Sequence, residues 1–273
     1  MYGAAIGDVI GSVYEHDNVK DKDFPLFCRY SRATDDTVMT VAVAEALMKL
    51  LNESPEIFEE LNEENRKIIN DEVMYSMKYF GNKYPHAGYG RSFREWLAYG
   101  TEPYNSWGNG SAMRTSPAGW LFDDLETTRA VAGIQAAVTH DHPEGVKGAE
   151  AIAAAVYMAR MGATKQEIKE YIEREFDYNL DRTIDGIRSV YEFDVSCQGS
   201  VPEAIIAFLE GRDFEDVIRN AISIGGDSDT IAAMAGAIAE AYYGAPADLI
   251  EKIEEIVPLD LLTVLRRFEE KYL

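Results

Sequence analysis

The sequence TIAAMAGAIAEAYY (Thr230–Tyr243) predicts a helix at the centre of the fold. Alanine and glycine fill half of this stretch, and such small side chains allow a second helix backbone to come close. Near the start of the chain, Gly3, Gly7 and Gly11 are four residues apart, so they fall on one stripe of a first helix. We expect both helices to be central. Close helix packing explains their small residues adequately, and direct contact with a ligand is the alternative.

Most of the remaining sequence repeats apolar residues at the three- and four-residue spacing of helices. Strand signals are weak, because only the short segments Phe24–Tyr30 and Tyr191–Val195 alternate. No repeat of fixed period divides the chain. The sequence therefore predicts an all-α protein, with residues 1–273 forming a single domain. The further helices are expected at Thr37–Leu51, Glu59–Phe80, Leu125–Val138, Gly145–Met161, Thr164–Phe176, Val201–Glu210, Phe214–Ile224 and Leu259–Tyr272.

Local signals mark two helix starts and one irregular segment. Thr164 and Glu167 form a capping box, and Asp213 with Asp216 is a weaker version of it. Residues 82–110 are rich in Gly, Pro and Tyr and lack the helical pattern. A segment of this length inside a compact domain is usually functional or disordered.

The charge balance limits the class of partner. Lys and Arg number 26 and Asp and Glu number 48, which gives a formal net charge of −22. We therefore expect neither a nucleic-acid groove nor a membrane surface, because both partners require a basic face. A single nucleotide-like ligand held by a few backbone amides remains compatible with this charge. Apolar residues make up 47% of the chain, as in ordinary globular proteins.

Targeting and cysteine signals are consistent with a cytoplasmic protein. No window approaches the roughly 20 consecutive apolar residues that cross a bilayer. The first residues carry no basic region and reach Asp8 early, so we expect no secretory signal. Cys28 and Cys197 are the only cysteines, and two thiols form neither a disulfide framework nor a zinc signature. We expect a reducing compartment.

Two acidic segments, TDDT (Thr34–Thr37) and GGDSDT (Gly225–Thr230), each stand directly before an apolar helix. Helix capping explains either segment taken alone, because Asp and Thr cap helices and complement the helix dipole. Their recurrence points to a second use, since carboxylates and hydroxyls are the ligands that suit Mg²⁺, Mn²⁺ or Ca²⁺. If the two helix starts meet, their carboxylates repel strongly unless cations lie between them. The pair of segments therefore predicts a two-metal site.

A third segment, SWGNGSAMR (Ser106–Arg114), combines glycines with an arginine. Backbone N–H groups of such a turn can surround an anion, and Arg114 can add positive charge. It matches neither a P-loop nor a dinucleotide fingerprint, and an ordinary turn is the alternative. Trp107 offers a flat face for a base or serves as a core anchor.

Four further side chains are candidates for the site. Asp8 and Glu15 are seven residues apart and face one way if the helix is continuous, and the apolar residues before Glu15 suggest a buried, partnered carboxylate. His140 and His142 follow an apolar helix, where histidines can be simple caps. Since His142 precedes Pro143 and belongs to the turn, we expect His140 to face a ligand. No covalent nucleophile is indicated, so the chemistry on offer is metal-activated water.

In combination, five segments resemble the ADP-ribosylglycohydrolase family, in the family's order and over nearly the whole chain. Each segment alone is weak evidence, and the five in sequence are specific. They are GAAIGDVIGSVYE (Gly3–Glu15), ATDDTVMT (Ala33–Thr40), SWGNGSAMR (Ser106–Arg114), VTHDHPEGVKGAEA (Val138–Ala151) and NAISIGGDSDTIAAMAGAIAEAYYG (Asn220–Gly244).

The resemblance implies a roughly orthogonal multi-helix fold that holds two Mg²⁺ or Mn²⁺ ions. It implies catalytic roles for Asp36, Asp229 and Glu15, the last of which matches a mobile glutamate of the family. The implied metal ligands are Thr34, Asp35, Asp36, Asp227, Asp229 and Thr230. The implied diphosphate and adenosine contacts are Asn105, Ser106, Trp107, Gly108, Asn109, Gly110, Ser111 and His140.

The activity that the resemblance implies is metal-dependent hydrolysis of the glycosidic bond between ADP-ribose and an acceptor. ADP-ribosyl-arginine on a protein is the first expectation, and serine, a nucleic-acid base or a small molecule are other acceptors. ADP-ribose is the expected product. Two alternatives stay open: a non-catalytic ADP-ribose-binding module, and a nucleotide phosphohydrolase that releases phosphate or AMP.

Overall fold

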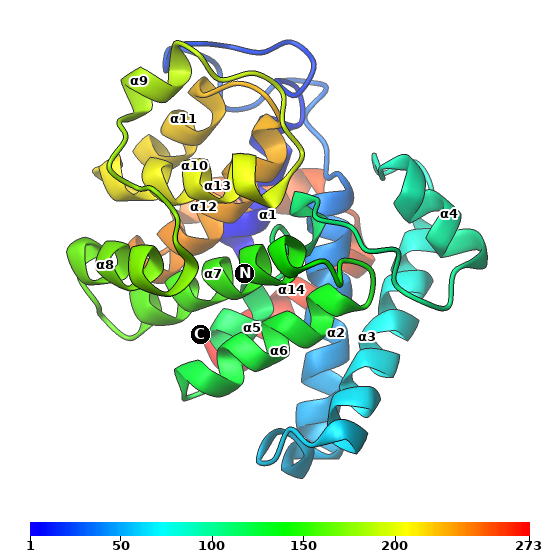
Figure 1. The fold of residues 1–273 in the computed structure, drawn as a ribbon. Helices are drawn as coiled ribbons and strands as arrows, with labels where there is room; N and C mark the ends of the chain where they lie inside the picture. The colour runs from blue at the N-terminus through cyan, green and yellow to red at the C-terminus, as the bar shows by residue number, and fades with distance from the viewer.

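Helices α1 (Tyr2–Gly11) and α12 (Ser228–Tyr243) pack against each other at the centre of the molecule (Figure 1). Every residue of α1 is buried. A Cβ atom on Gly7 would lie 2.0 Å from the carbonyl oxygen of Ala232, and one on Gly3 would lie 2.2 Å from that of Gly236. The glycine stripe therefore allows a backbone-to-backbone approach that no larger side chain permits. The sequence prediction of two central helices is confirmed.

The computed structural model describes residues 1–273 and contains α-helices and short 3-10 helices but no strand. The all-α prediction is therefore confirmed. Neither of the weakly alternating segments, Phe24–Tyr30 and Tyr191–Val195, forms a strand, and one isolated bridge joins Gly108 to Ser196. The other helices are α2 (Asp35–Glu53), η1 (Pro55–Phe58), α3 (Glu63–Lys83), α4 (Arg91–Tyr99), η2 (Asn109–Ser111), α5 (Ser116–Leu121), α6 (Leu125–Ala137), α7 (Pro143–Arg160), α8 (Lys165–Phe176), α9 (Ile184–Arg188), α10 (Cys197–Glu210), α11 (Phe214–Ser223), α13 (Ala247–Ile256) and α14 (Leu259–Tyr272).

The remaining helices surround this central pair. Helices α7, α10 and α11 pack on α12, while α2 and α3 run side by side along one flank and α6 runs across them (Figure 1). One continuous hydrophobic cluster of 80 buried residues connects these elements. This shared core supports the prediction of a single domain. None of the helices is long and apolar enough to span a bilayer.

The structure corrects several boundaries that the sequence pattern predicted. Helix α1 ends at Gly11, so Glu15 lies in the following turn and not on a continuous helix with Asp8. The irregular residues 82–110 include the unpredicted helix α4. Short helices α5 and α9 and the longer α13 were also not predicted. The capping box of Thr164 and Glu167 is confirmed.

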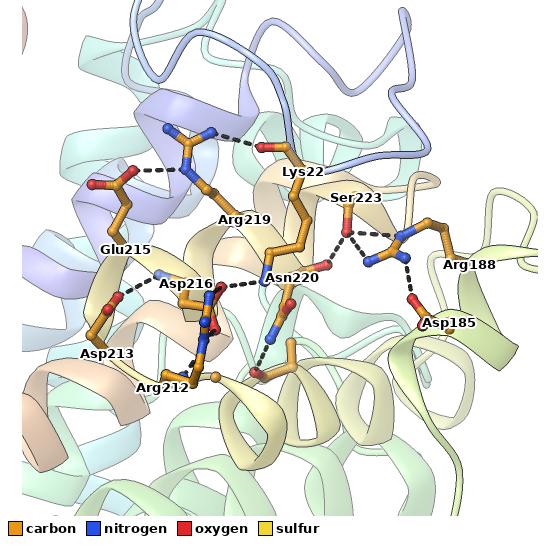
Figure 2. A network of polar contacts seen from close by, with 12 residues as sticks. Lys22, Asp185, Arg188, Arg212, Asp213, Glu215, Asp216, Arg219, Asn220 and Ser223 are labelled. Atoms are coloured by element: carbon orange, nitrogen blue, oxygen red, sulfur yellow. Dashed lines mark hydrogen bonds and ion pairs between the residues drawn. The ribbon is translucent and has the colours of Figure 1, made fainter.

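The segment between α1 and α2, which carries Glu15, is tied to α11 by a polar network (Figure 2). Arg219 donates hydrogen bonds of 2.9 Å to the carbonyl oxygens of Lys22 and Phe24, and Lys22 pairs with Asp216. Burial opposes ionisation of Asp216, but hydrogen bonds from Arg212 and Lys22 outweigh it and hold its pKa below the usual range. The network therefore fixes a long loop whose own structure is irregular.

Replacing Gly7 by alanine should strongly destabilise the protein, because the new methyl group meets the backbone of α12. We expect the free energy of unfolding in urea to fall by about 2–4 kcal/mol, as for severe overpacking. Gly90→Ala is the matched control, since nothing lies within 4 Å of a Cβ at that position. Equal stability of the two variants would contradict the close approach.

Replacing Asp216 by asparagine should remove about 1–3 kcal/mol of stability at neutral pH, the usual effect of losing charge-assisted hydrogen bonds. Because the folded-state pKa of Asp216 lies below the ordinary 3.8, this contribution is present above that value and is lost as pH falls through the folded-state pKa. In urea unfolding, the free energy of unfolding of wild type should exceed that of Asp216→Asn at neutral pH, and this excess should shrink in acid. Asp213→Asn is the control, because Asn caps the start of α11 as well as Asp does. If the free energies of unfolding of wild type and Asp216→Asn differed equally at all pH values, the lowered pKa of Asp216 would be contradicted.

Candidate active site

The Asp8 carboxylate joins α1 to the first turn of α2. Asp8 is completely buried and accepts hydrogen bonds from the backbone N–H and the hydroxyl group of both Thr34 and Thr37. The N–H bonds measure 2.9 Å and 3.0 Å. The side chain of Thr34 also caps α2 by accepting from the N–H of Asp36. These hydrogen bonds hold the first turn of α2 in place and so determine the positions of the Asp35 and Asp36 side chains.

Two helix starts meet, as the sequence predicts, and their carboxylates form two groups. In one group, oxygen atoms of Asp8, Asp36 and Asp229 lie within 4.8 Å of one another. In the other, oxygen atoms of Glu15, Asp227 and Asp229 lie within the same distance. Asp229 belongs to both groups. Its position is set by the close helix approach, because a Cβ on Gly11 would lie 2.4 Å from the Cα atom of Asp229.

Burial and mutual repulsion make these carboxylates costly to ionise. Burial, followed by the charges of Asp36 and Asp227, raises the pKa of Asp229 well above its usual value. Burial and the charge of Asp8 also raise the pKa of Asp36 well above its usual value. The same two causes raise the pKa of Asp35 to about 8. No lysine or arginine forms an ion pair with any of these aspartates.

The donor set fits divalent cations. Carboxylate oxygens are the ligands that Mg²⁺ and Mn²⁺ prefer. Oδ1 of Asp36 is buried and accepts no hydrogen bond, while Oδ2 accepts from the hydroxyl group of Thr230 at 3.2 Å. A buried anionic oxygen without a donor is unfavourable unless a cation contacts it. The two carboxylate groups are therefore able to hold metal ions.

A cavity of about 670 Å³ opens above the carboxylates. This volume lies in the usual range of small-molecule sites, about 300–1,000 Å³. It is lined by the predicted site residues Glu15, Thr34, Asp35, Asp36, Asn105, Ser106, Trp107, Gly108, Asn109, Gly110, His140, Asp227, Asp229 and Thr230. Ser111 is the exception, because its buried hydroxyl group donates to the carbonyl oxygen of Gly145 at 2.7 Å and does not line the cavity.

The glycine-rich segment is attached to both the carboxylates and the protein core. The amide of Asn109 donates to Asp227 at 2.7 Å. Arg114 is fully buried behind the turn, and its guanidinium contacts Gln135, Gly110 and Thr139. The proposed use of Arg114 as an anion contact is therefore not supported, since its N–H groups are directed to protein oxygens.

His140 lies beside the glycine turn and Trp107 lies at the cavity edge. His140 is 5% exposed, and burial followed by the charge of Arg114 lowers its pKa well below the usual value. Trp107 is 53% exposed and packs edge-on against His142, so it is not a core anchor. His142 caps α7 by accepting from the N–H of Glu144 at 3.1 Å, which agrees with its predicted place in the turn.

Sequence reasoning missed several residues of the site. Asp8 was recognised only as a candidate buried carboxylate, although it belongs to one of the two groups that could hold a metal ion. The cavity also includes aromatic and acidic side chains that no motif indicated, namely Tyr89, Phe93, Tyr104, Phe193 and Asp194. Three of these, Tyr89, Phe93 and Tyr104, lie in segment 82–110, and the composition of that segment was the signal available.

The sequence model of one protein family, the ADP-ribosylglycohydrolases, matches residues 1–272. The chain belongs to the ADP-ribosylglycohydrolase family. Its members are hydrolases that act on glycosidic bonds to ADP-ribose, and the chain is an enzyme of this class. The carboxylate groups and the cavity described above are thus the active-site candidates of an ADP-ribosylglycohydrolase.

Individual relatives are distant and cover most of the chain. ADP-ribosylhydrolase ARH3 of Mus musculus is 28% identical over 89% of this chain and 82% of its own length. ADP-ribosylarginine hydrolase Tri1 of Pseudomonas putida is 27% identical over 93% of this chain and 72% of its own length. A solved structure of an ADP-ribosylglycohydrolase-related protein complex has a TM-score of 0.65, at 24% identity over 97% of this chain and 95% of the other. This last similarity shows a shared fold.

The carboxylate groups give a stability prediction for the metal-free protein. Since the pKa of Asp35 rises from 3.8 to about 8 on folding, the folded state is destabilised progressively as pH increases through this interval. Asp35→Asn removes that penalty, so in EDTA the variant should become more stable than wild type towards pH 8 by about 1–2 kcal/mol, allowing for solvent screening. Adding Mg²⁺ should remove the difference.

Thermal and urea unfolding of both proteins across this pH range would measure the effect. Asp71→Asn, which alters an exposed carboxylate on α3, is the control. The opposite result, in which the wild-type protein becomes more stable than Asp35→Asn as pH rises, would contradict the raised pKa of Asp35.

Proposed function

We propose that this protein hydrolyses the glycosidic bond between ADP-ribose and an arginine side chain of a protein, using two Mg²⁺ or Mn²⁺ ions, and releases ADP-ribose. The observation that carries the proposal is the pair of carboxylate groups sharing Asp229 at the base of the cavity. Two groups of carboxylates with one common member would be able to hold two cations side by side. The ligands of this proposed centre are the cavity-lining residues Thr34, Asp35, Asp36, Asp227, Asp229 and Thr230. Asp8 and Glu15 complete the two carboxylate groups.

The substrate fits the cavity with its distal ribose over the carboxylates. The cradle for the diphosphate and adenosine is then the glycine turn and its neighbours, Asn105 to Gly110, with His140 beside it. Backbone N–H groups of such a turn offset the charge of a diphosphate. This local environment explains how a chain of net charge −22 can bind an anionic ligand.

Each carboxylate has a separate role in the proposed reaction. When bound, the two cations supply positive charge that orients the ribose hydroxyl groups and makes a water molecule more acidic. Asp36 and Asp229, whose carboxylate oxygens lie within 4.8 Å of each other, would hold the cations, and one of the two carboxylates would accept the proton of the attacking water. Glu15, whose side chain is 25% exposed, relays this proton to the leaving nitrogen. The new bond joins the water oxygen to the anomeric carbon of the ribose as the bond from that carbon to the guanidino nitrogen breaks. The departing group keeps the bonding electrons and takes up the proton that the water lost, so it leaves as a guanidinium.

Two acidic side chains at the cavity support arginine as the acceptor. Glu15 and Asp194 line the cavity near solvent, where the basic Arg32 and Arg91 also line it. A guanidinium group is cationic, so these carboxylates attract it and the overall negative charge of the protein assists. The similarity to an ADP-ribosylarginine hydrolase supports the same choice. Both cysteines are free, which supports the proposed cytoplasmic location.

The test is product analysis with a panel of ADP-ribose substrates linked through arginine, serine or a nucleic-acid base, with Mg²⁺ and with EDTA. We expect free ADP-ribose from the arginine substrate, and Asp36→Asn and Asp229→Asn should lower kcat by about a thousandfold or more with the helical content of the fold retained in circular dichroism. Asp71→Asn is the carboxylate control and should retain full activity. Unchanged turnover in both site variants would exclude this centre, release of AMP or phosphate would indicate a phosphohydrolase, and preference for another linkage would correct the acceptor.

A further inference from the structure

A chain of buried hydrogen bonds ends at the imidazole ring of His140. The Nδ1 atom of His140 lies 2.7 Å from the hydroxyl oxygen of Thr139, which is completely buried. The Nε2 atom has no hydrogen-bond partner in the protein and faces the glycine turn, 3.2 Å from where a Cβ of Gly110 would lie. The two ring nitrogens therefore have different surroundings, one in the protein interior and one at the cavity.

Arg114 determines the direction of the hydrogen bond between Thr139 and His140. An Nη2 N–H group of Arg114 lies 3.0 Å from the hydroxyl oxygen of Thr139, and arginine can only donate. That oxygen therefore accepts from Arg114. The Nδ1 atom of His140, 2.7 Å away, is the one acceptor that the hydroxyl group of Thr139 meets in full hydrogen-bond geometry, and the hydroxyl group of Tyr104 is a second polar neighbour of Thr139. A proton donated to Nδ1 requires that this ring nitrogen is unprotonated.

The position of Arg114 is itself fixed. Its Nε donates to the side-chain oxygen of Gln135 at 2.9 Å, and Nη2 also donates to the backbone oxygen of Gln135 at 3.1 Å. Nη1 donates to the carbonyl oxygen of Gly110 at 2.8 Å. Arg114 is therefore joined both to the glycine turn and, through Thr139, to His140. A fixed positive charge behind a buried imidazole also disfavours a second proton on the ring.

We infer that Arg114 and Thr139 are positioning residues that hold His140 as a neutral imidazole with its proton on Nε2, and that this N–H group donates a hydrogen bond to an oxygen atom of bound ADP-ribose. The second half of this inference rests on the proposed function, because it takes ADP-ribose as the ligand. The first half concerns the protein alone. Arg114 thus contributes to recognition without contacting the ligand.

Nitrogen-15 NMR of the imidazole rings tests the tautomer directly, in the full-length protein with Mg²⁺. The chain has four histidines, and the His140 signals are identified by their loss in His140→Gln. We expect wild-type His140 to show a protonated Nε2 and a hydrogen-bonded, unprotonated Nδ1. In Thr139→Val the Nδ1 signal should shift and the second tautomer should appear, and Thr139→Ser should restore the wild-type spectrum.

His142 provides an internal reference for the same spectra. Its Nδ1 atom accepts from the N–H of Glu144 at 3.1 Å, so its proton is also on Nε2. No residue of the Arg114 network contacts that ring nitrogen, so its signals should not move in Thr139→Val. A general loss of structure in the variant would move both histidines, whereas the loss of the Thr139 hydroxyl group moves only His140.

Calorimetric titration with ADP-ribose tests the second half of the inference. We expect Thr139→Val to bind ADP-ribose about tenfold more weakly, and Thr139→Ser to bind it as wild type does. A wild-type His140 protonated on Nδ1 would overturn the inference, and this measurement needs no variant. An altered tautomer with unchanged affinity would overturn the role of His140 as a donor to the ligand. Absence of hydrolysis from every linkage would instead contradict the proposed function and leave the tautomer result standing.

Discussion

The carboxylate of Asp8 is the interaction on which the site depends. It satisfies N–H and hydroxyl groups of Thr34 and Thr37 at the start of α2 and is itself buried in α1. The same side chain adds a negative charge to the group formed with Asp36 and Asp229. One carboxylate thus has a structural and an electrostatic role, and the hydrogen bonds that it accepts offset part of the penalty of its burial.

The repulsion among the buried carboxylates connects the packing of the helices with the chemistry of the site. The close approach of α1 and α12 places acidic groups from three parts of the chain around Asp229. Because no lysine or arginine neutralises them, the arrangement is complete only with cations. The glycine-rich turn and the Arg114 network then form a second, separately stabilised wall of the cavity, joined to the first through Asn109 and Asp227.

The sequence predicted the helical fold and the meeting of two acidic helix starts because both depend on local patterns. Apolar spacing identified most long helices, and the repeated acidic-then-threonine segment suggested convergence. The role of Asp8 could not be predicted, since its partners Thr34 and Thr37 are 26 and 29 residues away. The place of Ser111 depends on Gly145, 34 residues further on, and α13 was missed although Leu249 and Ile253 have helical spacing.

The contact between Gly11 and the start of α12 also has a consequence for biosynthesis. Ser228 bonds to the carbonyl oxygen of Gly11 across 217 residues of chain. During translation α1 leaves the ribosome first, and its main packing partner, α12, emerges more than 200 residues later. In a nascent chain of this topology, the hydrophobic side chains of α1 stay exposed for most of the synthesis. Chaperone binding near the amino terminus would therefore protect the chain from aggregation.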